Sequence, residues 1–302
     1  MTAVLPREAP PTELEAEQEE EVHAPRRRPP WLLLLPGLLW LALFFLVPMI
    51  TLASMSLQTG SLQTGYALTW TWSTYTDAWA TYGDQLVRSF LYAGSATVLA
   101  LIIGYPLAYA IAFKAGRWRN LMLVLVIAPF FTSFLIRTLA WKIVLADQGW
   151  VVSALQWIGL LGENGRLLAT PAAVVLGLTY NFLPFMVLPL YASLEKIDPR
   201  LLEAATDLYA TPARAFWAVT WPLSIPGVVA GTLLTFIPAA GDYVNVQFLG
   251  NPGSQMIGNV IQSRFLTVLD YPVAAALSIT VMVTVLVLVL SYVRRVGAKE
   301  LL

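Results

Sequence analysis

The sequence predicts an all-α, polytopic membrane protein with six transmembrane helices. Of its 302 residues, 58% are hydrophobic and only 12% are charged, and the mean hydropathy is +0.68. Roughly a quarter of the residues of an ordinary soluble domain are charged, so the composition argues against a soluble fold. Six separate apolar stretches also reach the length of about 20 residues that a helix needs to cross the hydrocarbon core of a bilayer.

Each apolar stretch predicts one membrane-spanning helix, because a helix satisfies its own backbone hydrogen bonds in lipid. The predicted spans are Trp31–Ala53, Val87–Phe113, Asn120–Ala146, Pro171–Leu194, Val219–Gly241 and Tyr271–Val293. Several of them carry prolines, among which Pro106, Pro129, Pro184, Pro189 and Pro238 lie within the second to fifth spans. Each proline removes a backbone hydrogen bond and kinks its helix. This pattern favours a bundle that encloses a cavity over a simple membrane anchor.

The distribution of basic residues predicts the orientation of the spans. Basic residues precede the first span and follow the second, fourth and sixth: Arg26, Arg27, Arg28, Lys114, Arg117, Arg119, Lys196, Arg200, Arg214, Arg294, Arg295 and Lys299. Segment 54–86, by contrast, contains no lysine or arginine. Basic residues accumulate on the cytoplasmic side of membrane proteins. Both termini and the loop at 196–216 are therefore expected in the cytoplasm.

Composition divides the chain into three parts. Residues 1–30 hold seven of the 18 acidic residues, all between Glu8 and Glu21, and few large apolar side chains. Such a segment cannot bury enough surface to fold, which predicts a disordered acidic cytoplasmic tail. Residues 31–296 are expected to form the six-span domain, and residues 297–302 a short cytoplasmic C-terminal tail.

The chain lacks the residues that most enzymatic chemistries need. It has no cysteine, and its one histidine, His23, lies in the acidic tail. Thiol chemistry, histidine catalysis and a metal site are therefore not expected. The phosphate-binding pattern G-x-x-x-x-G-K-[ST] is also absent. We expect neither an enzyme nor a nucleic-acid-binding protein, and the energy for any uphill transport would come from a partner or an ion gradient.

Residues 196–231 are the most informative part of the chain, because they place a charged, patterned segment between two apolar spans. Asp198-Pro199 and Thr211-Pro212 each combine an N-cap residue with a proline at the first helical position, which predicts two short helices. In the first, helical spacing gathers Leu201, Leu202, Ala205, Leu208 and Tyr209 on one face. This helix is expected to dock on a protein partner. The alternative, a helix lying on lipid, is usually rich in basic residues, whereas this one carries Glu203 and Asp207.

This segment resembles the cytoplasmic loop of permease subunits from binding-protein-dependent (type I) ABC importers. The resemblance rests on Glu203-Ala204-Ala205, followed by Pro222 and Pro226-Gly227. In that family the Glu-Ala-Ala triplet is followed, after three residues, by a glycine, and here Tyr209 takes the glycine's place. The expected consequence is that the tight turn is lost there and the chain breaks at Thr211-Pro212 instead.

Further motifs resemble the spermidine/putrescine branch of the same family. They are Gly104-Tyr105-Pro106-Leu107-Ala108-Tyr109, Ile136-Arg137 with Lys142, and Leu183-Pro184-Phe185-Met186 before Pro189-Leu190-Tyr191. The resemblance covers most of residues 31–296. It implies a bacterial plasma (inner) membrane permease that couples ATP hydrolysis in its partners to alternating access for polyamines.

The resemblance also implies a set of partners. These are a second homologous permease subunit, a dimer of ATP-binding subunits that holds ATP and Mg²⁺, and an extracytoplasmic substrate-binding protein. The loop residues expected to contact the ATPase are Leu202, Glu203, Ala204, Ala205, Asp207, Leu208 and Tyr209. No cofactor is expected in this chain itself.

Polar and aromatic residues of the third, fourth and fifth spans are the candidates for a substrate pathway. They are Arg137, Trp141, Tyr180, Asn181, Asp242 and Tyr243. A carboxylate beside aromatic rings suits an organic cation, through charge pairing and cation–π contact. A charge within a span, such as Arg137, is costly and usually faces protein or water. Structural alternatives stay open: the aromatic residues could form an interfacial belt, and Asp242 could be an ordinary loop acid.

Three other functions are also compatible with the sequence. The first is an ABC permease for another small organic solute, such as an amino acid, a sugar or an anion. An ion-coupled secondary transporter is less favoured, because such folds usually carry internal repeats and more spans. A membrane-embedded enzyme would need clustered histidine, serine–lysine or carboxylate groups, and the sequence shows no such cluster.

Overall fold

The computed structural model describes residues 30–162 and 164–297. The predicted acidic tail and nearly all of the C-terminal tail lie outside these residues. The chain divides into two compact units, one up to Thr51 and one from Leu52 onward, and each is described by itself.

The first unit is a nearly continuous apolar helix that matches the first predicted span. It consists of α2 (Pro30–Leu41) and the π-helical turn η1 (Ala42–Leu46), and it continues into α3 (Val47–Ser56). The stretch Leu34–Ser56 is long and apolar enough to cross a membrane. Its large side chains are mostly exposed within the chain, as expected of a helix that faces lipid or another subunit.

The second unit begins with a short β-hairpin that the sequence did not predict. Strand β1 (Gln58–Ser61) pairs antiparallel with β2 (Gly65–Leu68). Helix α4 (Ser73–Phe113) follows and is 41 residues long. It starts well before the predicted second span, because the segment before Val87 extends the same helix beyond the apolar run. A hydrogen bond from the Tyr66 hydroxyl to the Leu269 carbonyl oxygen (2.5 Å) joins the hairpin to the segment just before the last span.

The third predicted span, by contrast, is broken. After η2 (Gly116–Trp118), α5 (Arg119–Ile127) and η3 (Ala128–Phe131) run in one direction, and α6 (Phe134–Val144) turns away by 97°. Thr132 is extended at the break, and the Thr132 side chain bonds back to the Pro129 carbonyl (2.6 Å). The kink expected from Pro129 is therefore present, but it is an extended break centred three residues further along, at Thr132. Helix α7 (Trp150–Trp157) follows.

The fourth and fifth spans enclose the charged loop. Helix α8 spans Pro171–Leu194, as predicted. The two short helices of the loop also form: α9 (Pro199–Asp207), capped by Asp198, and α10 (Pro212–Ala215), capped by Thr211. The π-helical turn η4 (Phe216–Thr220) then leads into α11 (Trp221–Ala240). The two N-cap predictions are confirmed by hydrogen bonds from the backbone N–H groups of Arg200 (2.9 Å) and Arg214 (3.3 Å) to the cap side chains.

Shorter elements connect α11 to the last span. They are α12 (Val244–Leu249), η5 (Pro252–Ser254) and α13 (Ile257–Leu266). The last span is α14 (Tyr271–Tyr292), which ends in η6 (Val293–Gly297).

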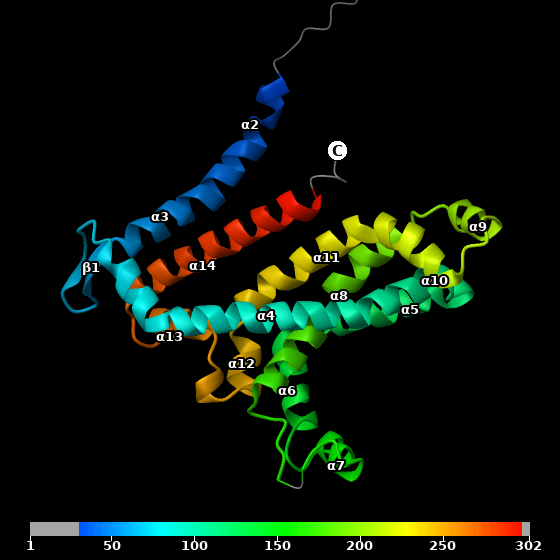
Figure 1. Ribbon diagram of the computed structural model, residues 1–302. Helices are drawn as coiled ribbons and strands as arrows, with labels where there is room; N and C mark the ends of the chain where they lie inside the picture. Colours follow the sequence, from blue (N-terminus) through cyan, green and yellow to red (C-terminus); the bar gives the residue numbers. More distant parts are fainter. Residues whose placement is uncertain (1–29, 163, 298–302) are drawn as a thin grey trace, which may run out of the picture. The chain divides into compact units, whose positions relative to one another are not determined.

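Helices α4, α8 and α11 form the centre of the second unit, and they lie side by side in Figure 1. One apolar core lies among α4, α8, α11 and α12, around Leu178, Phe182 and Leu249. A second lies towards the charged loop, around Tyr105, Met186 and Ile197. Among the described residues, five helices are long and apolar enough to span a membrane, or six if the bent pair counts as one span. The chain is thus an all-α polytopic membrane protein.

Candidate functional site

Four polar side chains from three helices and a turn meet inside the apolar core. The Asn181 amide nitrogen on α8 donates to the Asn245 side-chain oxygen on α12 (3.0 Å) and to the Thr138 hydroxyl on α6 (3.3 Å). The Thr138 hydroxyl also lies 3.4 Å from the same Asn245 oxygen. Asn245 in turn donates through its side chain to Asp242 Oδ1 (3.2 Å). We call Thr138, Asn181, Asp242 and Asn245 the polar cluster, and all four are buried.

Asp242 is the charged member of the polar cluster. It lies in the turn after α11, where its Oδ1 accepts a hydrogen bond from the backbone N–H of Asn245 (2.8 Å) and so anchors the start of α12. Burial disfavours the ionised form. It raises the pKa of the Asp242 carboxyl to about 6, although the hydrogen bonds from Asn245 oppose this rise. Asp242 is therefore a buried carboxyl group whose pKa lies above its ordinary value.

Close packing of α8 against α12 holds the polar cluster in place. A side chain at Gly177 would put its Cβ 2.4 Å from Leu249 Cδ1 and 2.8 Å from the Asn245 side-chain oxygen. Only glycine leaves room for Asn245 to reach Asn181 one turn along α8. The two ends of the Asn181 amide differ. Its nitrogen donates two hydrogen bonds, whereas its side-chain oxygen is buried without a hydrogen-bond partner among the described residues. The cluster thus offers an unused acceptor beside a carboxylate.

A second group lies at the bend of the third span. Arg137 is 8% exposed, and its guanidinium carbon lies 5.1 Å from the Phe130 ring centre and 5.6 Å from that of Phe134. Its Nε and one Nη are buried without hydrogen-bond partners in the described chain. Trp141 packs edge-on against Tyr180, with ring centres 5.3 Å apart.

The six predicted pathway residues thus fall into three places. Asp242 and Asn181 meet in the polar cluster, while Arg137, Trp141 and Tyr180 lie on α6 and α8 near the bend. Tyr243 is 41% exposed and lines a different pocket, of about 340 Å³, against α13 and α14. Sequence neighbours such as Tyr180 and Asn181 point to different sides of their helix.

The sequence prediction missed two members of the polar cluster, Thr138 and Asn245. Asn245 stands three residues after Asp242, which is the spacing at which an aspartate side chain caps a helix, so a signal for it was present. No sequence signal pointed to Thr138, because the hydroxyl of a threonine in a span usually donates a hydrogen bond to a carbonyl of its own helix. It does so here as well, to the Phe134 carbonyl (3.1 Å).

Helix α9 is the most solvent-facing helix near the charged loop. None of its residues is buried, and Leu201 is 46% exposed. At the end of the helix Leu208 and Tyr209 are 83% and 97% exposed. The apolar face predicted from the sequence is present, and the chain covers it only in part, at Leu202 and Ala205. A face of this kind outside a bundle is typical of a docking surface.

Tyr209 forms the tight turn that its replacement of glycine was expected to abolish. Its φ is +58°, in the left-handed region that favours glycine. The Tyr209 N–H bonds to the Thr206 carbonyl (2.9 Å) and the Ala210 N–H to the Ala205 carbonyl (3.0 Å), the paired bonds of a Schellman C-cap. The prediction that the break moves to Thr211-Pro212 was therefore wrong, because the backbone bonds of the cap outweigh the steric cost of a tyrosine there.

We expect Tyr209→Gly to stabilise the free chain and to weaken its docking. Glycine removes a left-handed strain of about 1 kcal/mol, but it also removes an exposed aromatic ring, a type of side chain that often anchors interfaces at 2 kcal/mol or more. Thermal melting in detergent and pull-down of the bound partner measure the two effects. Tyr209→Phe is the matched control, since it keeps both the ring and the strain. Tighter partner binding by the glycine variant would contradict this prediction.

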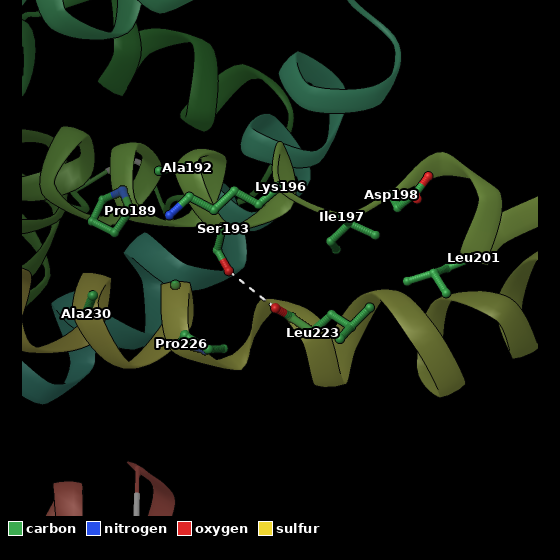
Figure 2. A pocket seen from close by; sticks show the side chains of 11 residues that line it. Pro189, Ala192, Ser193, Lys196, Ile197, Asp198, Leu201, Leu223, Pro226 and Ala230 are labelled. Atoms are coloured by element: carbon green, nitrogen blue, oxygen red, sulfur yellow. Dashed lines mark hydrogen bonds between the residues drawn. The ribbon is translucent and has the colours of Figure 1, made fainter. Parts of the chain in front are cut away.

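A pocket lies beneath the charged loop, between α8 and α11 (Figure 2). It has a volume of about 570 Å³. Its wall is lined by Pro189, Ala192, Ser193, Lys196, Ile197, Asp198, Leu201, Leu223, Pro226, Gly227 and Ala230. The two helices approach closely at one edge, where a Cβ on Gly227 would lie 2.6 Å from Ser193 Cβ, and the Ser193 hydroxyl donates to the Leu223 carbonyl (3.3 Å). The pocket separates α9 from the helices below it.

The chain belongs to the binding-protein-dependent transport system inner membrane component family, which matches residues 96–299. It is therefore a permease subunit and a multi-pass protein of a bacterial inner membrane. The chain is 38% identical, over 84% of its length and 93% of the relative's, to the spermidine/putrescine transport system permease protein PotB of Escherichia coli K12. It is 39% identical to the protein of the same description from Haemophilus influenzae, again over 84% of this chain and 90% of the relative.

A solved structure shares the fold. It is a bacterial alginate ABC transporter in complex with an alginate pentasaccharide-bound periplasmic protein. One of its chains superposes with a TM-score of 0.65 at 20% identity, covering 94% of this chain and 98% of that chain. The likeness confirms the architecture of the bundle.

Proposed function

We propose that this chain is a permease subunit of an ABC importer that carries polyamines such as spermidine and putrescine. The observation that carries the substrate class is the 38–39% identity, over most of both chains, to permeases described as spermidine/putrescine transport proteins. The chemistry of the polar cluster agrees, because polyamines at neutral pH present N–H donors and positive charge. The cluster presents the Asp242 carboxylate and the unused Asn181 oxygen.

The chain would work within a larger assembly. We place a dimer of ATP-binding subunits, with ATP and Mg²⁺, against the exposed face of α9. A second homologous permease and an extracytoplasmic substrate-binding protein complete the importer. In this assignment both termini and the α8–α11 loop are cytoplasmic, in keeping with the basic residues at these ends. This chain itself would bind no nucleotide.

In the proposed mechanism the chain's residues hold the substrate and receive a mechanical signal. Asp242 attracts the ammonium groups of the substrate, while Asn181 accepts a hydrogen bond from them. Thr138 and Asn245 keep both groups oriented. Closure of the ATPase dimer displaces α9 through Leu208, Tyr209 and Glu203. That displacement reaches the bundle through the ends of the flanking helices and opens the cluster alternately to the two sides.

Uptake of radiolabelled spermidine and putrescine into cells with and without this gene tests the proposal. We expect deletion to abolish ATP-dependent polyamine uptake, and an excess of amino acids or sugars to leave wild-type uptake unchanged. Restoration by a plasmid copy controls for effects on neighbouring genes. Unchanged polyamine uptake in the deletion strain would overturn the substrate assignment.

A second candidate substrate class is an anion or a zwitterion, such as an amino acid. Arg137 favours it, because two of its nitrogen donors are buried without partners in the described chain. A carboxylate would satisfy such donors bidentately. The competitors in the same uptake experiment separate the two classes, since an amino acid substrate would compete only if this second assignment holds.

A further inference from the structure

Arg119 and Glu195 form an ion pair beside the charged loop that no function described above uses. Arg119 is the first residue of α5, and Glu195 is the C-cap of α8. The Arg119 guanidinium is paired with the Glu195 carboxylate, and its Nε donates to the Tyr191 hydroxyl. Its central carbon also lies 5.1 Å from the centre of the Tyr191 ring. One side chain thus joins the third span to the end of the fourth by three contacts.

Both charges stand at helix ends that disfavour them. A helix has a partial positive charge at its N-terminus, where Arg119 lies, and a partial negative charge at its C-terminus, where Glu195 lies. Neither residue therefore serves its own helix. Their attraction to each other opposes both unfavourable positions.

The ion pair lies where the charged loop joins the end of α8. Leu201 of α9 shares the wall of the pocket of about 570 Å³ with residues of α8 and α11 (Figure 2), and α9 packs mainly on α10 and η4. The first residue of α9, Pro199, stands only four positions after Glu195. Ile197, between them, is buried in the apolar core. A push on α9 therefore reaches the end of α8 at the ion pair.

The third span leads from this point to the polar cluster. Helix α5 begins at Arg119 and ends before the 97° break, and α6 beyond the break carries Arg137 and the cluster's Thr138. We propose that Arg119 is a positioning residue that couples movement of the loop at α9 to the bent third span. This proposal rests on the proposed function, because it takes α9 to be the contact with the ATPase.

The pair is a poor candidate for a purely stabilising contact. The Arg119 and Glu195 side chains are 34% and 44% exposed, and ion pairs this exposed contribute little to stability. Loss of the pair should therefore change transport more than folding. This difference separates a positioning role from a structural one.

The test uses the complex purified with this chain as bait and uptake measured in cells. We expect Arg119→Gln and Glu195→Gln each to lower polyamine uptake at least about tenfold, while ATP hydrolysis by the complex stays within about twofold. The double variant should be no worse than either single one, because both remove the same contact. The exchange Arg119→Glu with Glu195→Arg should recover a substantial part of uptake.

Arg117→Gln is the matched control. Arg117 lies two residues away, is exposed, and contacts only the Trp118 ring among the described residues, at 5.4 Å. Its variant should transport as the wild type does. If Arg119→Gln fails to insert into the membrane, Glu195→Gln and Tyr191→Phe decide, since each removes one contact without adding a charge.

Uptake within about twofold of wild type in Glu195→Gln, or strictly multiplicative losses in the double variant, would overturn the positioning role. The outcome of Glu203→Lys separates this failure from failure of the proposed function. If Glu203→Lys uncouples transport and the Arg119 variants do not, only the positioning role is wrong. If Glu203→Lys also transports normally, the ATPase contact itself is wrong.

Discussion

Glu203→Lys is expected to leave the chain inserted in the membrane and to lower ATP-driven uptake about 100-fold. Glu203 is exposed on α9 and makes no ion pair within the described chain, so the free chain loses nothing when it changes. At the proposed interface, however, the substitution reverses a charge. Breaking one partner of a desolvated charge pair costs about 2–5 kcal/mol, so uptake should fall by about 100-fold. Uptake in cells and co-purification of the ATPase measure the effect.

Asp77→Lys is the control for this change. Asp77 is also exposed, but it lies near the start of α4, on the side of the membrane opposite α9 in the proposed orientation. The same reversal of charge there should spare both uptake and ATPase binding. Retained ATP-driven uptake in Glu203→Lys, with the protein present at wild-type level, would remove α9 as the coupling contact.

Asp242→Asn is expected to lower polyamine uptake at least about tenfold without lowering expression. The asparagine side chain keeps an oxygen to accept from the Asn245 backbone and side chain, so the turn before α12 should survive. Only the charge is lost, and charge-assisted hydrogen bonds are roughly twice as strong as neutral ones. The measurement is uptake at pH 7.5 against the amount of protein in the membrane. Unchanged uptake would exclude Asp242 from the pathway.

The pH dependence of the wild type provides an independent check of Asp242. Burial raises its pKa from 3.8 to about 6, so its charge is lost as the pH falls through 6, and about a tenth remains ionised at pH 5. Wild-type uptake should decline over that range, whereas the low remaining uptake of Asp242→Asn should change much less. A parallel decline in both proteins would assign the pH effect to other groups.

The contribution of Asp242 to the stability of the fold should change with pH in the direction opposite to uptake. A carboxyl whose pKa is raised by folding binds its proton more tightly in the folded state, so it favours the fold at low pH. This contribution is lost as the pH rises from about 4 through 6. At pH 7.5 the Asp242→Asn variant should therefore melt at a higher temperature than the wild type, and the difference should shrink at pH 5. The wild type retains a destabilising charge, as functional sites often do.

Much of the fold could be predicted because lipid restricts the choice of structure. A long apolar stretch must be helical, and the fourth span, Pro171–Leu194, has the predicted ends. The caps at Asp198 and Thr211 were also predictable, because a cap depends on the side chain and the next few residues. A kink near Pro129 was predictable as well, but the extended residue at Thr132 and the 97° change of direction were not. Hydropathy averages over a window and does not register a change of direction between two apolar segments.

The site could be predicted only in part, for a similar reason. Sequence alone singled out Asp242 and Asn181 as polar groups in an apolar context, and it located the exposed face at Glu203. It could not tell that Tyr180 and Asn181 serve different groups, because that depends on how α8 is rotated against its neighbours. Nor could it show Tyr209 in the left-handed region, where a complete C-cap overrides the local preference of the residue.

The sequence by itself thus determined the membrane class, the helical fold, the position of the spans and the location of the loop. These follow from hydropathy, charge and local capping, which act over a few residues or along one helix. Only the tertiary structure decided the meeting of Thr138, Asn181, Asp242 and Asn245 and the pairing of Arg119 with Glu195. These contacts join residues up to 107 positions apart, and they depend on the close approach and rotation of packed helices.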